Sequence, residues 1–107
     1  MIFHIAQQID WQTAEKAGTY DIPGLHEEGF IHCSTAEQVV RTANRLFLGR
    51  RDLVLLEIDE TLVVPKVIFE GRLEKFPHIY GPINLNAVTK VHPFQPLANG
   101  EFLLPQP

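Results

Sequence analysis

The sequence GFIHCST, from Gly29–Thr35, contains the transition on which our reading of the fold depends. Phe30 and Ile31 form a short apolar run of β-forming residues, with a glycine before it and polar residues after it. Ser34 is followed three residues later by Glu37 and then by an apolar stripe, which is the spacing of a capping box at a helix start. We therefore expect a strand to end here and a helix to begin at once.

The same junction carries a histidine, a thiol and two hydroxyls. A strand that leads into a helix N-terminus leaves backbone N–H groups unpaired beside a positive dipole end, which suits an anionic ligand. We therefore predict His32 as a catalytic residue and Ser34 and Thr35 as ligand-binding residues; as alternatives, His32 is scaffold and Ser34 only a cap. Cys33 is either a buried apolar residue or a catalytic thiol, and strand alternation turns it away from His32.

Apolar periodicity predicts two helices. The first runs over Trp11–Ala17, with Asp10 as its N-cap and Gly18 after its end. The second runs from Thr35 to about Leu48 and ends before Gly49. Five apolar residues share one face of this second helix: Val39, Val40, Ala43, Leu46 and Phe47.

The longest apolar run, Leu53–Ile58, predicts a central strand buried on both faces. Shorter runs predict further strands at Ile2–Ala6, Phe30–Ile31, Leu62–Val64, Val67–Glu70, Ala87–Val91 and Phe102–Leu104, the last after an Asn-Gly turn. Helices come early and short connections follow residue 50. The pattern favours a single α+β domain over residues 1–107, with about seven short strands, mostly antiparallel, and two or three helices.

A second unusual stretch is FPHIYGPIN, Phe76–Asn84. Its two prolines restrict the preceding residues, so we expect a rigid, irregular loop, which is a common location for functional residues. If the segment is extended, His78 and Tyr80 project to the same side. We predict His78 as catalytic and Tyr80 and Gly81 as ligand-binding; the alternative is that Tyr80 packs over a sheet edge and His78 is solvated.

Two isolated polar residues complete the candidate set. His4 lies among apolar residues on the first strand, so it is either a buried histidine bonded to a backbone carbonyl or a catalytic residue lining a pocket. Glu70 ends a strand and is either simply exposed or a ligand-binding carboxylate.

Composition excludes several classes of function. Of the 107 residues, 45% are hydrophobic, enough for a core without metal or disulfides. The net charge of −4 argues against non-specific nucleic-acid binding. No zinc-ligand spacing, glycine-rich dinucleotide motif or phosphate-binding loop occurs, so no metal site is predicted.

The single cysteine, Cys33, cannot form an internal disulfide, which fits a reducing compartment. The sequence shows neither the apolar region of a secretory signal nor a run long enough to cross a membrane. We expect a cytoplasmic protein without membrane contact; the sequence does not indicate its oligomeric state.

Five motifs together resemble domain-of-unknown-function family 952, a family of small bacterial proteins. They are GFIHCST-x-x-Q, ANRLF-x-G, DLVLLEID, FPHIYGPIN and the closing G-x-F-x-LP, and the resemblance runs from His4 to Pro105. The family name assigns no function. A more distant similarity links the family to the ADP-ribosyltransferase-like fold, including its RNA 2′-phosphotransferase branch.

That similarity implies a split antiparallel sheet around an NAD-shaped cleft. His4 would bond the nicotinamide ribose, His32 and Ser34 would shape the nicotinamide pocket, and His78 or Tyr80 would supply a late polar residue. The sequence departs from the transferase pattern because its last motif has no glutamate, for which Glu70 is the nearest candidate.

Two functions remain open at this stage. The first is a small enzyme or sensor that binds NAD, as a possible substrate, or an ADP-ribose-like nucleotide, and acts at the ribosyl C1′ or at a ribose phosphate. The second is a non-catalytic module that binds a protein or a small ligand. The sequence indicates no obligatory cofactor.

Overall fold

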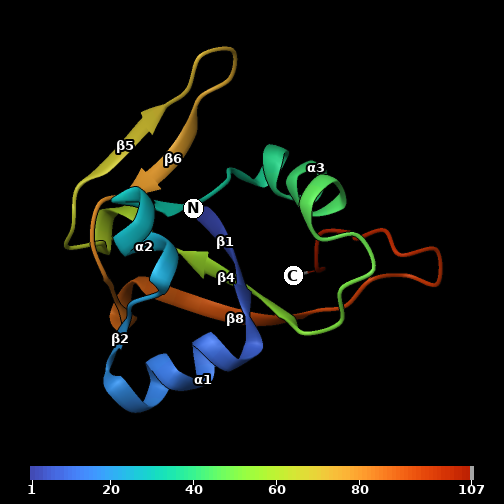
Figure 1. Cartoon of the computed structure of the whole chain (residues 1–107), viewed down its shortest axis with the longest axis horizontal. Helices are drawn as coiled ribbons and strands as arrows, with labels where there is room; N and C mark the ends of the chain where they lie inside the picture. Colours follow the sequence, from blue (N-terminus) through green and yellow to red (C-terminus); the bar gives the residue numbers. More distant parts are fainter. Residues whose placement is uncertain (107) are drawn as a thin grey trace.

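The computed structural model describes residues 1–106 and places eight β-strands and three α-helices in them (Figure 1). Pro107, the last residue of the predicted domain, lies outside the described part. The strands are β1 (Ile2–Gln7), β2 (Thr19–Tyr20), β3 (Ile31–His32), β4 (Leu53–Ile58), β5 (Val67–Glu70), β6 (Phe76–Ile79), β7 (Ile83–Asn84) and β8 (Val88–Phe94). The helices are α1 (Gln8–Ala17), α2 (Pro23–Glu28) and α3 (Ala36–Leu46). Every strand pairing given for these residues is antiparallel, which confirms the α+β prediction.

The strands form separate small sheets. β4 is the middle strand of the sheet β1-β4-β8, as its apolar run predicts, and β6 is the middle strand of the sheet β3-β6-β5. β2 and β7 make a two-residue ladder of their own. A backbone bridge between Phe3 and Ser34 joins the two three-stranded sheets, with N···O distances of 2.8 Å in both directions.

The two faces of β4 explain its continuous apolar run. Leu56 and Ile58 pack into one core cluster with Tyr20, while Leu53 and Leu55 pack into a second with Phe102. Helix α3 covers the second cluster with an apolar face that includes Val39 and Ala43. Each face of the strand is therefore buried against a different layer, as expected for an uninterrupted apolar strand.

Both predicted helices exist, but their starts differ from the prediction. Helix α1 begins at Gln8, directly after β1, and Asp10 lies in its first turn rather than at its N-cap. Helix α3 is capped by Thr35 and Gln38, not by Ser34 and Glu37. The Gln38 side-chain oxygen accepts a hydrogen bond from the Thr35 backbone N–H at 3.0 Å, so the capping box is one residue later than its sequence spacing suggested.

The ends of two predicted elements are also wrong. Helix α3 stops at Leu46 because Phe47 leaves helical geometry at φ −128° and packs against the second core cluster. Phe102–Leu104 is not a strand. Phe102 is instead held by stacking on Phe94, with ring centroids 4.7 Å apart, and by donation of its N–H to Asn44.

The predicted irregular loop at Phe76–Asn84 is wrong in its first half, which forms β6. Proline disfavours a central strand because it cannot donate a ladder hydrogen bond. Pro77 is accommodated because its carbonyl makes the contact on the β3 side, accepting from Cys33 N–H at 2.9 Å. The second half, beyond Ile79, contains the short strand β7.

Other short elements were not foreseen. Helix α2 lies where we predicted no helix, although Pro23 at its start and Gly29 at its end, with φ +89°, are the residues typical of those positions. The strand predicted at Leu62–Val64 does not form: Leu62 ends a short 3₁₀ turn, Glu60–Leu62, and the two valines after it lie in no strand. Strands of two residues such as β2 carry too little pattern to be recognised in sequence.

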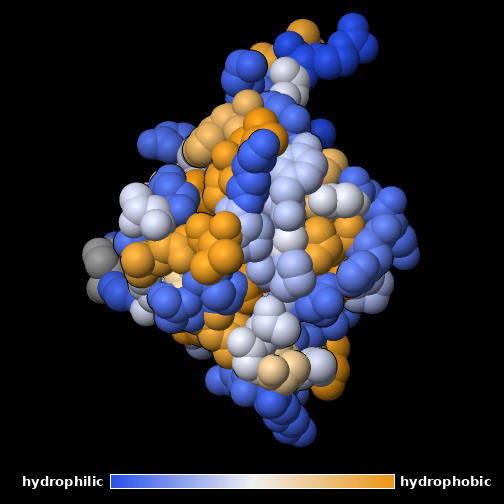
Figure 2. Space-filling view, turned by 90° about the vertical axis from the view of Figure 1, so that its left-hand side faces the viewer, coloured by the Kyte–Doolittle hydropathy of each residue, from blue (hydrophilic) through white to orange (hydrophobic). Residues whose placement is uncertain are grey.

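Apolar side chains are gathered on the face that Figure 2 presents, interrupted by hydrophilic groups. In Figure 1 this side carries β5 and the segment before it, whose exposed apolar residues include Leu62, Val64 and Phe69. None of the helices in residues 1–106 is both long and apolar enough to cross a membrane.

Candidate functional site

A cavity of about 560 Å³ opens between the two larger sheets and helix α3. Its walls come from β1, from the segment between α2 and β3, from α3, and from the β5–β6 hairpin. Most of the lining is apolar or aromatic, and its charged or polar side chains include His32, His78, Glu28, Glu70, Ser34 and Arg45. A concave apolar site of this volume with a few polar groups is typical of small-molecule binding.

Two of the predicted catalytic histidines face each other in this cavity. His32 on β3 and His78 on β6 are direct cross-strand partners, so their side chains lie on the same face of the sheet. Their ring centroids are 5.1 Å apart, with the ring planes at 81°. His32 is open to solvent, whereas the side chain of His78 is only 12% exposed.

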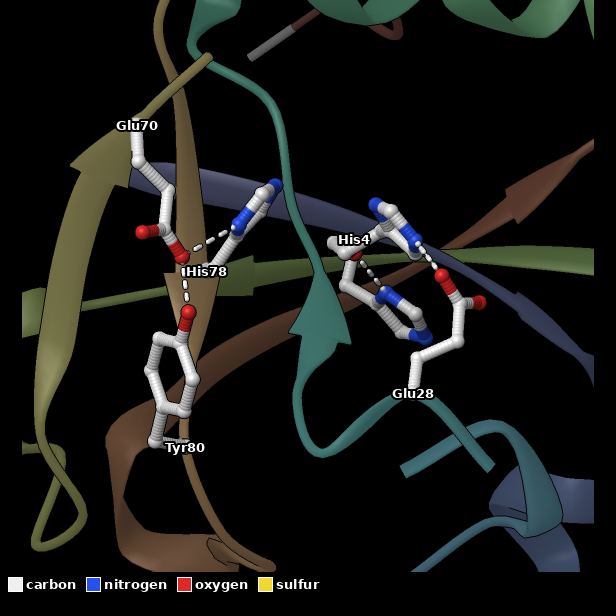
Figure 3. Close-up of polar contacts among 6 residues, drawn as sticks. His4, Glu28, Glu70, His78 and Tyr80 are labelled. Carbon is white, nitrogen blue, oxygen red and sulfur yellow. Dashed lines mark hydrogen bonds and ion pairs between the residues drawn. The ribbon is translucent and has the colours of Figure 1, made fainter. Parts of the chain in front are cut away.

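Each of these imidazoles is hydrogen-bonded to its own carboxylate (Figure 3). His32 Nε2 lies 2.9 Å from Glu28 Oε2, and His78 Nδ1 lies 2.9 Å from Glu70 Oε1. The Tyr80 hydroxyl donates to the same Glu70 oxygen. Donation by a ring N–H to a carboxylate fixes the tautomer and leaves the second ring nitrogen available as a proton acceptor.

The hydrogen bonds of Glu70 also set its charge. Donation by Tyr80, and then by His78, lowers the pKa of the Glu70 carboxyl below its ordinary value. The same bond raises the pKa of the Tyr80 hydroxyl. Glu70 is therefore a carboxylate at neutral pH, placed within hydrogen-bonding distance of the His78 ring.

Phe30 lies among the three rings of this face. It stacks on His78, with centroids 4.1 Å apart and planes 13° from parallel, and meets His32 edge-on at 4.8 Å. The Tyr80 ring is 5.4 Å away. Phe30, His32 and His78 therefore form a continuous aromatic and imidazole surface at the cavity wall, onto which a planar ligand group can stack.

The third predicted catalytic histidine, His4, lies in different surroundings. It is buried, its Nδ1 is 2.6 Å from the His32 carbonyl oxygen, and its Nε2 is 2.8 Å from the Tyr20 hydroxyl. Burial lowers the pKa of the His4 imidazole to about 4, so the ring is neutral at pH 7. It borders the cavity, but both ring nitrogens are occupied. Its catalytic role stays a prediction; the contacts suit a positioning role that holds the backbone of β3 at His32.

The remaining predicted residues divide between the cavity and its surroundings. Ser34 is nearly buried and borders the cavity, and its hydroxyl is not the α3 cap. Thr35 and Gly81 do not belong to the lining, and Tyr80 reaches it only through Glu70. A side chain at Gly81 would lie 3.0 Å from Pro65, so this glycine serves packing.

Cys33 faces the core, as strand alternation predicts. It is buried with the first core cluster, and burial raises the pKa of its thiol. A buried thiol with a raised pKa is a poor nucleophile, so the structure supports the reading of Cys33 as an apolar core residue. Among residues 1–106, no three histidine, cysteine or acidic side chains gather in a metal-binding cluster.

Four residues at this site were not singled out from the sequence: Glu28, Phe30, Gln38 and Arg45. Glu28 precedes His32 by four residues and Phe30 precedes it by two, so the strand period alone places Phe30 on the same face as His32. Gln38 and Arg45 carry no such local signal. They reach the site because α3 packs beside the β5–β6 hairpin.

Comparison with solved structures places the chain among proteins of the same architecture. It is similar to the crystal structure of CC0527 from Caulobacter crescentus, with 29% identity, a TM-score of 0.87, and coverage of 96% of this chain and 93% of that one. The crystal structure of a double mutant of CC0527 gives the same values. The solution NMR structure of CC0527 gives a TM-score of 0.82 at 29% identity, covering 94% and 89% of the two chains.

No protein with a curated description matches the sequence. The family model described as "Protein of unknown function (DUF952)" matches residues 5–91, which include half of β1, all three helices and both cavity histidines. The chain therefore belongs to the DUF952 family.

Proposed function

We propose that the protein binds an NAD- or ADP-ribose-type nucleotide in the cavity and acts on its ribosyl group by transfer or hydrolysis. The observation that carries the proposal is the facing pair His32 and His78, each held by a carboxylate at 2.9 Å on the wall of a cavity of about 560 Å³. The stacking surface around Phe30 and the mainly apolar lining suit a nucleotide base or a nicotinamide ring.

The proposed chemistry breaks the bond between the ribosyl C1′ and the nicotinamide nitrogen. The bond's electron pair leaves with nicotinamide, the oxygen of water or of an acceptor hydroxyl bonds to C1′, and its proton passes to a free ring nitrogen of His32 or His78. Positive charge that develops on the ribose is favoured by the nearby carboxylates of Glu28 and Glu70. Histidine is the side chain that most often accepts a proton in general base catalysis.

Glu70 takes a particular place in this proposal. ADP-ribosyltransferase-like proteins resemble this chain but differ from it in one respect: the last motif of this sequence has no glutamate. Glu70 borders the cavity and is hydrogen-bonded to both His78 and Tyr80, which supports assigning it that role. Small antiparallel sheets around a cavity are also what an ADP-ribosyltransferase-like fold implies.

We also propose that the protein acts in the cytoplasm. Its one cysteine is free and buried, which fits a reducing compartment. As for partners, its net charge of −4 does not favour a nucleic acid.

A thermal-shift screen with NAD, ADP-ribose and simple nucleotides tests the proposal. A ligand at a hundred times its Kd adds about 2.7 kcal/mol to the free energy of unfolding, which raises the Tm of a domain of this size by roughly 10 °C. The shift is expected to disappear in His78→Ala and to persist in His92→Ala. His92 is the matched control because it makes the same kind of bond, to Glu57 at 2.9 Å, away from the cavity. No shift with any of these compounds would contradict nucleotide binding and favour the non-catalytic module.

A further inference from the structure

Three of the chain's five arginines line one hollow next to the cavity. Arg41 and Arg45 on α3 and Arg72 at the tip of the β5–β6 hairpin border a space of about 390 Å³. Among the described residues, Glu74 is the one acidic side chain in its lining, so the hollow carries net positive charge in a protein whose total charge is −4. Charge of the opposite sign to the whole protein, concentrated in a concavity, favours an anionic ligand.

The side chain of Gln38 holds the hollow in shape through hydrogen bonds to both of its walls. The side-chain oxygen of Gln38 caps α3 at Thr35, while its amide nitrogen donates to Glu74 Oε2 at 3.0 Å and to the Lys75 carbonyl at 2.8 Å. These bonds join the helix to the hairpin tip. Gly71 shapes the turn, because its φ is +154° and a Cβ at this position would collide with the Glu74 carbonyl oxygen. The two walls that carry the arginines are therefore positioned before any ligand arrives.

The arginines differ in their availability. Arg41 forms an ion pair with Glu74, which neutralises the carboxylate of the hollow. Within residues 1–106, Arg45 and Arg72 make no ion pair. A guanidinium group presents parallel N–H donors that match the oxygens of a phosphate, so these two residues offer unoccupied phosphate-binding groups.

The hollow adjoins the larger cavity. Arg45, Thr42, Glu74 and Phe76 belong to the lining of both, whereas His32 and His78 line the cavity alone. A ligand whose ribosyl end lies against the histidines can therefore extend past these shared residues toward the arginines.

We propose that the hollow lined by Arg41, Arg45 and Arg72 is an anion subsite for a pyrophosphate group. This inference rests on the proposed function in one respect only, namely that the pyrophosphate belongs to a nucleotide whose ribosyl group occupies the cavity. It narrows the substrate class to phosphorylated nucleotides and excludes free nucleosides as good ligands.

Inorganic pyrophosphate is the direct probe, titrated into the protein by calorimetry at low ionic strength. Arg45→Gln and Arg72→Gln are each expected to weaken pyrophosphate binding about tenfold, since hydrogen bonds between charged groups are among the strongest. Arg51→Gln is the matched control, an exposed arginine outside both hollows, and is expected to leave the affinity unchanged. Raising the salt from 0.01 M to 0.15 M shortens the screening length from about 30 Å to about 8 Å and should weaken binding further.

The outcomes separate this inference from the proposed function. Absence of pyrophosphate binding, equal affinity in all variants, or an equal loss in Arg51→Gln would overturn the anion subsite. A parallel titration with ADP-ribose tests nucleotide binding separately. If ADP-ribose binds and its affinity is unchanged by Arg45→Gln and Arg72→Gln, the anion subsite is overturned while nucleotide binding is retained. Arginine-dependent pyrophosphate binding without any ADP-ribose binding supports the subsite and contradicts the proposed function.

Discussion

The buried histidine His4 and the facing pair His32 and His78 lie close together in the fold, yet their surroundings are opposite. His4 has a backbone carbonyl and a tyrosine hydroxyl as partners and almost no contact with solvent. The facing pair has carboxylate partners and borders an open cavity. The comparison shows that burial and the kind of partner, rather than residue type, decide whether an imidazole braces the backbone or lines a cavity.

The two regions are also connected. The carbonyl that accepts the His4 Nδ1–H bond belongs to His32 itself. The buried ring therefore fixes the backbone from which the exposed ring projects, and we expect substitutions in the two regions to separate stability from function.

The largest expected effect is on activity. His78→Ala should reduce nicotinamide release from NAD by about 10²–10⁴-fold, because a positioned proton acceptor contributes that much to a reaction rate. Chromatographic measurement of nicotinamide checks this. His92→Ala, which removes an imidazole bonded to Glu57 outside the cavity, should retain the wild-type rate. An equal loss in both variants would show that the cavity pair has no special role.

The buried region should respond in stability instead. His4→Ala removes the partner of the His32 carbonyl and the Tyr20 hydroxyl and leaves space in the core, which should lower the free energy of unfolding by about 4 kcal/mol. Urea unfolding measures this change. His26→Ala, at an exposed imidazole bonded to Asp21, should change stability by less than about 0.5 kcal/mol. A similar, small effect for both variants would show that the His4 contacts contribute little.

The depressed pKa of His4 predicts a pH dependence of stability. The unfolded chain protonates this ring near pH 6.5 and the folded protein only near pH 4, so the unfolded state binds more protons between these values. The contribution of His4 is therefore complete above pH 6.5 and is lost as the pH falls toward 4, by about 3 kcal/mol.

Urea unfolding at pH 7, 5.5 and 4.5 measures this loss against the variant His4→Asn. The carboxamide keeps a donor for the His32 carbonyl but does not titrate, so its stability should fall less steeply with acid than that of the wild-type protein. Identical slopes for the two proteins would show that His4 titrates normally.

The smallest expected effect concerns Glu70, the carboxylate that is hydrogen-bonded to His78. Glu70→Gln should leave the free energy of unfolding nearly unchanged, since the Glu70 side chain is 39% exposed and the glutamine oxygen can still accept hydrogen bonds from His78 and Tyr80. It should nevertheless slow nicotinamide release, because the neutral amide stabilises positive charge on the ribose less well. Parallel unfolding and activity measurements check the separation. A large loss of stability with unchanged activity would reverse the roles assigned to the two regions.

Sequence patterns found the elements with strong periodicity. The apolar run Leu53–Ile58 and the apolar stripe of α3 could be recognised from neighbouring residues alone, because each buries a whole face of its element. The pattern at Phe76–Asn84 misled because proline is rare in a strand, and only the pairing of β6 between β3 and β5 explains the tolerance of Pro77. The Thr35 cap was missed because Ser34 offered an equally good spacing one residue earlier.

The sequence predicted individual site residues but not how they are arranged in space. His32 and His78 were singled out separately, and the cross-strand register that makes them neighbours is a long-range property. The hydrogen-bond partners of His4 could not be predicted because they come from distant parts of the chain. A buried ring bonded to a backbone carbonyl was nevertheless one of the two interpretations that its apolar neighbours allowed. Arg45 and Gln38 join the site through packing between α3 and the hairpin, for which the sequence carries no local sign.

The most direct test of the central claim follows the side-chain nitrogens of the histidines by NMR while ADP-ribose is added. The ring signals of His32 and His78 should move together and saturate at one affinity, while those of His26 and His92, outside the cavity, should stay in place. Unmoved signals for the facing pair, or equal movement of all the rings, would contradict nucleotide binding at this cavity.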